Sequence, residues 1–348
     1  MASSLASAAL AKGSLLLVTG ANGACFVGSH AVNEALKLGY RVRGVVRDAS
    51  KLSVLKKRWD DEFPGRFEVA VVEESEKEGA YDEAMKGVSG VAHISPRSGG
   101  RSLSAASLST SNQILTCLRS AARSPSVQRF VLTSTTAAAH AETPEVEFTA
   151  GQESWNEEVV GQAEKEEGPM KGLYVYLASK MLGERAAWDW VKENKPSFDF
   201  YAVLPGFNIG PLLDPASQKG ATAHNVLELY EGGKPFIVYF DSFSWVSVLD
   251  VALLHLGALV LPSSLLNPHS SPSHRLFAAA GPFSAYALLD VFRRNEPEKR
   301  FEMELPAPKK AVGKWDTEGS ERVLKALKGG EGWERLEETV RRTVEAGR

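Results

Sequence analysis

Short apolar runs alternate with stretches of helical periodicity through the first half of the chain. Runs of this kind, rich in Val and Leu, are typical of strands buried on both faces of a parallel sheet. They are Leu15–Thr19, Arg41–Val46, Phe67–Val72, Val88–Ile94 and Phe130–Thr133. Helical patterns lie between most of them, and Val27–Leu38 stops at Gly39, a residue favoured just past a helix end. The alternation predicts an α/β fold with a doubly wound parallel sheet, whose ligands bind beyond the carboxyl ends of the strands.

The last part of the chain carries a different pattern. Two amphipathic stretches, Glu318–Lys328 and Trp333–Val344, predict a pair of helices joined at Gly329-Gly330. We expect a dinucleotide-binding unit over residues 14–206, to which residues 240–262 return, and a smaller C-terminal substrate lobe formed by residues 207–239 and 263–348. Residues 1–13 are rich in Ala and Ser without a basic segment, so we expect a short leader that is not a signal peptide.

Composition narrows the class of protein. The chain has 348 residues, of which 43% are hydrophobic and 24% charged, with a net charge of -3. This balance predicts no nucleic-acid partner and no anionic membrane partner, and no apolar run approaches the ~20 residues that span a bilayer. Cys25 and Cys117 provide neither a disulfide framework nor zinc spacing, and the histidines are scattered, so no metal site is expected. A cytoplasmic protein is the expectation, and the oligomeric state stays open.

A glycine-rich turn follows the first strand directly. It reads Thr19-Gly20-Ala21-Asn22-Gly23, and Gly28 lies in the helix that follows. Glycines at such a turn let a pyrophosphate approach the amides at a helix N-terminus, which predicts a Rossmann-type dinucleotide site; the alternative is a purely structural turn. Arg47 follows the second strand directly, and an arginine there suits the 2′-phosphate of NADP, with Lys51 and Arg43 as possible helpers. The alternative is that these residues form only a solvated basic edge.

Tyr176 and Lys180 are the most informative pair in the chain. They are four residues apart within a stretch of helical periodicity, so both side chains lie on one helix face. A nearby ammonium favours the phenolate and lowers the tyrosine pKa from about 10. Tyr176 is therefore a candidate acid that protonates a carbonyl oxygen. An ordinary amphipathic helix with a surface lysine is the alternative.

Together these motifs resemble an extended short-chain dehydrogenase/reductase of the NAD-dependent epimerase/dehydratase superfamily. The similarity is greatest to fungal and yeast NADPH-dependent aldehyde/ketone reductases and to dihydroflavonol reductases. The stretches that carry it are Arg43–Arg47, Lys56–Asp60, Gly79–Asp82, Gly90–Ile94, Val127–Ser134, Val175–Lys180, Ala202–Pro205 and Val248–Ala252.

The resemblance implies NADPH as cofactor and a small apolar carbonyl compound as substrate. In that family the tyrosine, here Tyr176, protonates the carbonyl oxygen. The lysine, here Lys180, lowers the pKa of the tyrosine and holds the nicotinamide ribose. A hydroxyl after the fifth strand, from Thr135 or Ser134, would bind the carbonyl oxygen. Further implied cofactor contacts come from Gly20, Asn22, Gly23, Gly28, Arg47, Lys51, Glu74 and Pro205. Asp250 would cap a late helix.

The chain departs from the family pattern on the cofactor side. Ala24-Cys25 lengthens the glycine loop, Glu74-Ser75 replaces the usual adenine contacts, and residues 95–107 form a Ser/Gly/Arg-rich stretch that predicts a loop. The asparagine of the proton relay would fall near Thr110. Three accounts stay open: an error in the deduced reading frame, a reductase with a remodelled loop, or a fold that has lost hydride transfer and acts as an isomerase, cyclase or nucleotide-sensing binder.

Overall fold

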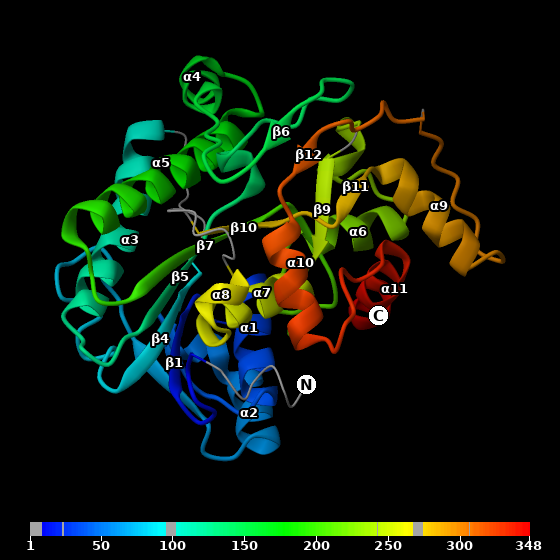
Figure 1. Ribbon diagram of the computed structural model, residues 1–348. Coiled ribbons are helices and arrows are strands. Elements are labelled where there is room, and N and C mark those ends of the chain that lie inside the picture. The colour runs from blue at the N-terminus through cyan, green and yellow to red at the C-terminus, as the bar shows by residue number, and fades with distance from the viewer. Residues whose placement is uncertain (1–8, 23, 95–101, 242, 267–273, 306) are drawn as a thin grey trace.

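A seven-stranded parallel sheet forms the centre of the molecule in the computed structural model, which describes residues 9–22, 24–94, 102–241, 243–266, 274–305 and 307–348 (Figure 1). The strand order is β10-β7-β5-β4-β1-β2-β3, and every neighbouring pair is parallel. The strands are β1 (Leu15–Thr19), β2 (Arg41–Val46), β3 (Phe67–Val71), β4 (Val88–His93), β5 (Arg129–Thr133), β7 (Asp199–Pro205) and β10 (Arg275–Ala278). The predicted doubly wound fold is confirmed.

Helices cover both faces of this sheet, which explains why its strands are apolar throughout. β1 and β5 are buried at every position. One face is covered by α1 (Phe26–Lys37), α2 (Ser53–Glu62), α7 (Val248–Val260) and α10 (Glu318–Leu327). The other is covered by α3 (Leu103–Ala122) and α5 (Lys171–Asn194), with α4 (Glu158–Lys165) packed on α5. Two apolar cores result, one on each side of the sheet.

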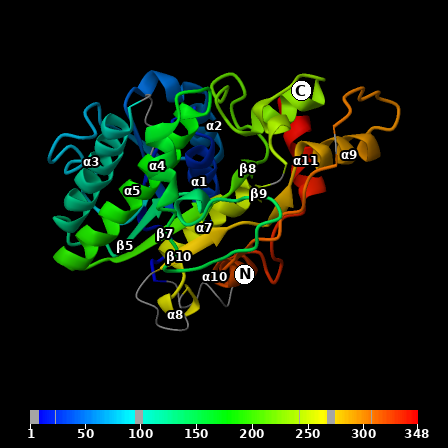
Figure 2. The ribbon, with the colours of Figure 1, turned by 90° about the horizontal axis from the view of Figure 1, so that it is seen from above.

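A second group of elements lies beyond the carboxyl ends of β7 and β10. A small sheet joins β8 (Phe207–Ile209), β9 (Phe243–Ser247) and β11 (Gly281–Phe283). It shares a third apolar core with α6 (Ala223–Tyr230), α9 (Ala285–Asn295) and α11 (Leu336–Gly347). Figures 1 and 2 both place α9 and α11 on the opposite side of the molecule from α3 and α5. A strand pair, β6 (Thr149–Ala150) with β12 (Lys314–Trp315), and the short helices η1 (Ala49–Leu52), η2 (Thr136–Ala138), η3 (Phe236–Tyr239) and α8 (Ser263–Leu266) complete the described elements.

The division of the chain into two units stays a prediction. β10 lies at the edge of the main sheet, and α10 packs against α7 and β10. Parts of the 263–348 range therefore belong physically to the main sheet as well as to the smaller group. Both C-terminal helices form, although the second begins at Leu336, three residues later than predicted. Gly329 and Gly330, with φ of +69° and +106°, provide the left-handed turn after the first.

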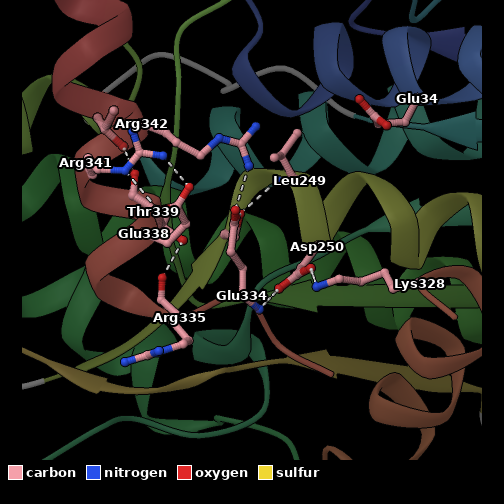
Figure 3. A network of polar contacts seen from close by, with 12 residues as sticks. Glu34, Leu249, Asp250, Lys328, Glu334, Arg335, Glu338, Thr339, Arg341 and Arg342 are labelled. Carbon is pink, nitrogen blue, oxygen red and sulfur yellow. Dashed lines mark hydrogen bonds and ion pairs between the residues drawn. The ribbon is translucent and has the colours of Figure 1, made fainter. Parts of the chain in front are cut away.

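The expected N-cap role of Asp250 is wrong. Ser247 caps α7, because its hydroxyl accepts the Leu249 amide, and Asp250 lies inside the first turn. The buried Asp250 carboxylate instead accepts Lys328 Nζ at 3.0 Å and the Glu334 amide at 2.7 Å, as Figure 3 shows. It therefore holds the segment between α10 and α11 against α7.

The expectation of a loop over residues 95–107 is wrong for its last part. α3 begins at Leu103, and the Ser102 hydroxyl accepts the Ala105 amide as an N-cap. Residues 95–101 lie outside the described residues. Thr110 is buried, and its side chain lies 3.0 Å from where a Cβ on Gly183 of α5 would be. At the expected relay position, Thr110 therefore contributes to the close packing of α3 on α5.

Candidate active site

The glycine turn keeps its close approach despite the two extra residues. Gly20 has a φ of +67°, and a Cβ on it would lie 2.5 Å from the Ile94 carbonyl oxygen. A Cβ on Gly28 would lie only 2.1 Å from the Gly20 carbonyl oxygen. Both positions therefore require glycine, and the first turn of α1 packs directly on the end of β1. Gly23 lies outside the described residues.

The inserted residue Cys25 lies at the N-terminus of α1. It is the N-cap residue, and its amide donates to the Asn22 carbonyl oxygen at 3.0 Å. Burial raises the pKa of the Cys25 thiol; the amides of Gly28 and Val27 and the Lys180 ammonium act in the opposite direction. The Cys25 side chain makes no capping hydrogen bond, but its Sγ atom lies 3.2 and 3.1 Å from where Cβ atoms on Gly20 and Gly28 would be. The thiol therefore fills space directly beside the glycine turn.

Asn22 presents a further polar group at this turn. Its Oδ1 atom is buried and accepts no hydrogen bond from the described residues. A buried acceptor without a donor costs free energy, so this atom is well suited to a ligand hydroxyl or amide. Together with the glycine cradle, it fits a dinucleotide at this turn.

The basic residues of β2 and of the segment after it divide into two groups. Arg47 and Lys51 are exposed, in keeping with a phosphate contact. Arg43 instead pairs with Glu68 at 2.7 Å and donates to the Ala84 and Lys86 carbonyl oxygens, at 2.7 and 2.8 Å. Its guanidinium is thus committed to structure, and its suggested role as a helper is wrong.

Glu74, expected near the adenine, is exposed after β3. Its carboxylate pairs with Lys77 at 3.3 Å, and its carbonyl oxygen accepts the Lys77 amide. Because both side chains are more than 70% exposed, this ion pair is weak and leaves the carboxylate able to exchange partners.

Lys180 is buried on α5 and reaches the carboxyl end of β5. Its Nζ atom donates to the Thr133 carbonyl oxygen at 2.5 Å. Burial lowers the pKa of Lys180 to about 8, against the opposing charges of Glu184 and Cys25. Tyr176, half-buried, precedes it by one turn of the same helix. The predicted helical pair therefore exists, and its lysine lies at the ligand-binding edge of the sheet.

The two candidate hydroxyls after β5 have different environments. Ser134 is buried, and its Oγ donates to Glu184 Oε2 at 2.5 Å. Thr135 is half-buried, and its Oγ1 donates to the Pro205 carbonyl oxygen at 3.3 Å, at the end of β7. The Ser134 hydroxyl is therefore committed to a structural partner, whereas Thr135 lies beside Pro205, another residue expected in the cofactor site.

Sequence reasoning missed the buried ion pair beneath these residues. Glu184, one turn after Lys180, pairs with Arg275 of β10 at 2.8 Å, and both side chains are 0% exposed. Arg275 also donates to the Gln152 and Ser154 carbonyl oxygens and lies over the Trp155 ring. The four-residue spacing from Lys180 to Glu184 was visible in the sequence, but the arginine partner was not.

Two buried histidines, His255 of α7 and His93 of β4, contact strand ends at the site. His255 Nδ1 donates to the Val251 carbonyl oxygen at 2.8 Å, so its Nε2 accepts from Thr133 Oγ1 at 2.6 Å. His93 Nδ1 lies 3.2 Å from Thr19 Oγ1. Burial lowers the pKa of His255 to about 4 and that of His93 to about 3, so both are neutral at pH 7. They therefore position strand ends without carrying charge.

Neither a metal site nor a membrane span is found in the residues that the structure describes. No group of three or more His, Cys, Asp or Glu side chains there is arranged to hold a metal ion. No helix there has the length and apolar character needed to cross a bilayer.

Known proteins with similar sequences are reductases and related enzymes. A family model described as "NAD dependent epimerase/dehydratase family" matches residues 16–270. Aldehyde reductase 2 of Sporidiobolus salmonicolor is 43% identical over 97% of both chains. Ketoreductase adrE of Penicillium roqueforti is 37% identical over 82% of this chain and 81% of its own.

A solved structure shares the fold over nearly the whole length of both chains. It is yeast methylglyoxal/isovaleraldehyde reductase Gre2 complexed with NADPH, with a TM-score of 0.76 and 24% identity. The alignment covers 96% of this chain and 98% of that one.

Proposed function

Because this chain belongs to the NAD dependent epimerase/dehydratase family, as its motifs predicted, we propose that it reduces an aldehyde or ketone to an alcohol with NADPH. The observation that carries the proposal is the Tyr176–Lys180 pair, with its lysine held at the end of β5 by the Thr133 carbonyl oxygen. The relatives named aldehyde reductase and ketoreductase support the same reaction class.

The residues of the glycine turn fit the proposed cofactor. Gly20 and Gly28 bring the end of β1 and the first turn of α1 into close contact, and the pyrophosphate would lie against the amides of this turn. The Asn22 side chain would form a hydrogen bond with the cofactor at the same turn. Arg47 and Lys51 would bind its 2′-phosphate. When bound, NADPH supplies the hydride that reduces the carbonyl carbon. The Cys25 side chain, which lies beside Gly20 and Gly28, would have to turn away from the phosphate.

Tyr176 is the proposed proton donor. Its hydroxyl would protonate the carbonyl oxygen as the carbon is reduced, and the Lys180 ammonium would stabilise the phenolate that remains. Thr135 would donate a hydrogen bond to the same carbonyl oxygen, exchanging it for the bond it makes to Pro205. Ser134 would act only through Glu184.

An apolar substrate of small or medium size is the proposed class. Aromatic side chains gather in the lobe that follows Pro205, where the Phe207 ring lies 5.3 Å from Phe243 and 5.2 Å from Phe283. Phe236 and Tyr239 of η3 add exposed aromatic surface to the same lobe. Aromatic surface of this kind favours a ligand with an apolar body.

The test measures NADPH consumption with a panel of aryl ketones, ketoesters and aldehydes. We expect turnover by the native protein, and a loss of about 10²–10⁴-fold in kcat for Tyr176→Phe, with NADPH affinity nearly unchanged. Tyr174→Phe, two residues earlier on the same helix, serves as the matched control and should retain activity. Unchanged turnover in Tyr176→Phe would refute the role. NADPH binding without consumption of any substrate would favour a nucleotide-sensing binder. Conversion of a substrate without NADPH consumption would favour an isomerase or cyclase.

A further inference from the structure

A cavity of about 320 Å³ lies between the small sheet and the β6–β12 pair. Its wall includes Glu142, Phe148, Ser244, Val312 and Trp315. None of these residues has a part in the proposed reduction. Pockets of this size commonly bind small molecules when a few polar groups converge on an apolar lining.

The polar side of the cavity is a carboxylate with fixed hydrogen-bond directions. Trp315 Nε1 donates to Ser244 Oγ at 2.8 Å. Ser244 in turn donates to Glu142 Oε2 through both its hydroxyl, at 2.7 Å, and its amide, at 2.8 Å. Since indole and amide nitrogens only donate, this chain of bonds favours an ionised Glu142 that accepts. It also holds the carboxylate in one orientation.

Glu142 has no positive partner within the described part of the chain. No ion pair there includes it, and its second oxygen, Oε1, accepts no hydrogen bond from those residues. Burial raises the pKa of Glu142, and the two bonds from Ser244 offset this only in part. Lys314 lines the cavity but is exposed and makes no ion pair with Glu142. A partly buried carboxylate with a free oxygen is stabilised by a cationic donor.

The remaining wall is aromatic and closely built. The Phe148 ring stacks on His140 at 4.2 Å and meets the Trp315 ring edge-on at 5.0 Å. Gly313 lies so close to Phe148 that a Cβ there would be 1.9 Å from the ring. Aromatic rings attract cations and also bind apolar groups. The lining therefore suits a ligand that has a charged head and an apolar body.

We propose that this cavity is a binding site for a small organic ammonium ion with an apolar or aromatic body, its ammonium group placed on the free oxygen of Glu142. The site is separate from the catalytic residues. Ser244 lines the cavity, and its carbonyl oxygen packs against Gly206, 2.6 Å from where a Cβ on that glycine would be. On the other side, the Pro205 carbonyl oxygen accepts the Thr135 hydroxyl. Binding thus requires neither NADPH nor turnover.

The test is calorimetric titration of the full chain, without NADPH, with 2-phenylethylammonium chloride. We expect saturable binding, and binding at least about tenfold weaker for the neutral analogue 2-phenylethanol, which keeps the ring and chain but loses the charge. Glu142→Gln should weaken ammonium binding at least about tenfold, since it keeps the shape and removes the charge. Glu145→Gln, an exposed neighbour, is the matched control and should bind as the native protein does.

A second variant tests the apolar side independently. Val312→Trp should fill the cavity and abolish binding of both compounds, with an unchanged thermal midpoint as evidence of folding. The proposal is overturned if the native protein shows no saturable ammonium binding, if Glu142→Gln binds it as tightly as the native protein, or if Val312→Trp still binds. None of these results bears on reductase activity, which NADPH consumption measures separately.

Discussion

Replacing Glu184 by glutamine should destabilise the protein strongly and also lower the pKa of Lys180. Glu184 and Arg275 form an ion pair in which both side chains are 0% exposed. The same carboxylate accepts the Ser134 hydroxyl at 2.5 Å and the Trp188 indole at 3.1 Å. Glutamine has nearly the same shape, so the substitution removes charge without creating a cavity. It leaves the Arg275 guanidinium buried and still protonated.

The expected magnitude follows from the burial of the pair. Removing one partner of a buried ion pair costs about 3–5 kcal/mol, because the remaining charge loses its compensation. Unfolding entropy is about 2.1 cal/mol/K per residue, or roughly 0.7 kcal/mol/K for this chain, so the thermal midpoint should fall by about 4–7 °C. Removing both charges, in Glu184→Gln with Arg275→Met, should recover part of that loss.

Denaturant and thermal unfolding of purified protein measure this effect. Glu318→Gln is the matched control, since Glu318 pairs with Arg322 at 2.7 Å on the surface, where its side chain is 71% exposed. An exposed pair contributes at most about 1 kcal/mol, so the control should unfold almost as the native protein does. A Glu184→Gln midpoint within about 1 °C of the native value would refute the assigned importance of the pair.

The same variant should shift the pH dependence of reduction. Burial lowers the pKa of Lys180 to about 8, even though the charge of Glu184 raises it. Activity that needs the ammonium is present below that pKa and is lost as pH rises through it. Without Glu184 the pKa falls further, so the alkaline limb of the kcat profile should move to lower pH. An unmoved limb would show that Lys180 protonation does not limit the rate.

The cofactor side yields three further predictions. Gly28→Ala places a Cβ 2.1 Å from the Gly20 carbonyl oxygen, so NADPH affinity, measured by fluorescence titration, should fall at least about tenfold. Deleting Ala24 and Cys25 together should strengthen NADPH binding, because it removes the thiol that fills space beside Gly20 and Gly28; weaker binding would contradict this. Arg47→Asp should shift the ratio of kcat/KM values toward NADH, and an unaltered ratio would remove the basis for the 2′-phosphate contact.

Most of the fold was predictable because its signals are local. Strands buried on both faces must be apolar along their whole length, so β1 and β5 stand out in the sequence. The start of α3 was not predicted, because the serines and glycines before it mask its first turn. Ser102 is both part of that loop-like composition and the N-cap of the helix, and periodicity cannot separate the two roles.

The site was predictable only where its residues share one element. Tyr176 and Lys180 lie one helical turn apart, so spacing alone paired them. Whether Ser134 or Thr135 is free to bind a substrate depends on Glu184, which accepts the Ser134 hydroxyl. Glu184 in turn pairs with Arg275, which is 91 positions away in the sequence. Partners at such separation are joined by the packing of β10 on β7, which no local pattern reveals.

Stability and the proposed proton transfer therefore involve the same buried charges. Arg275 compensates the buried charge of Glu184, with which it pairs at 2.8 Å. Ionised Glu184 in turn counters the burial that lowers the pKa of Lys180, which keeps most of the ammonium protonated at neutral pH. Removing the charge of Glu184 should thus lower reductase activity at neutral pH through Lys180, even where the fold survives. The pH profile of kcat distinguishes such a positioning role from simple instability. A changed Lys180 pKa shifts the alkaline limb of the profile, whereas partial unfolding lowers kcat without shifting that limb.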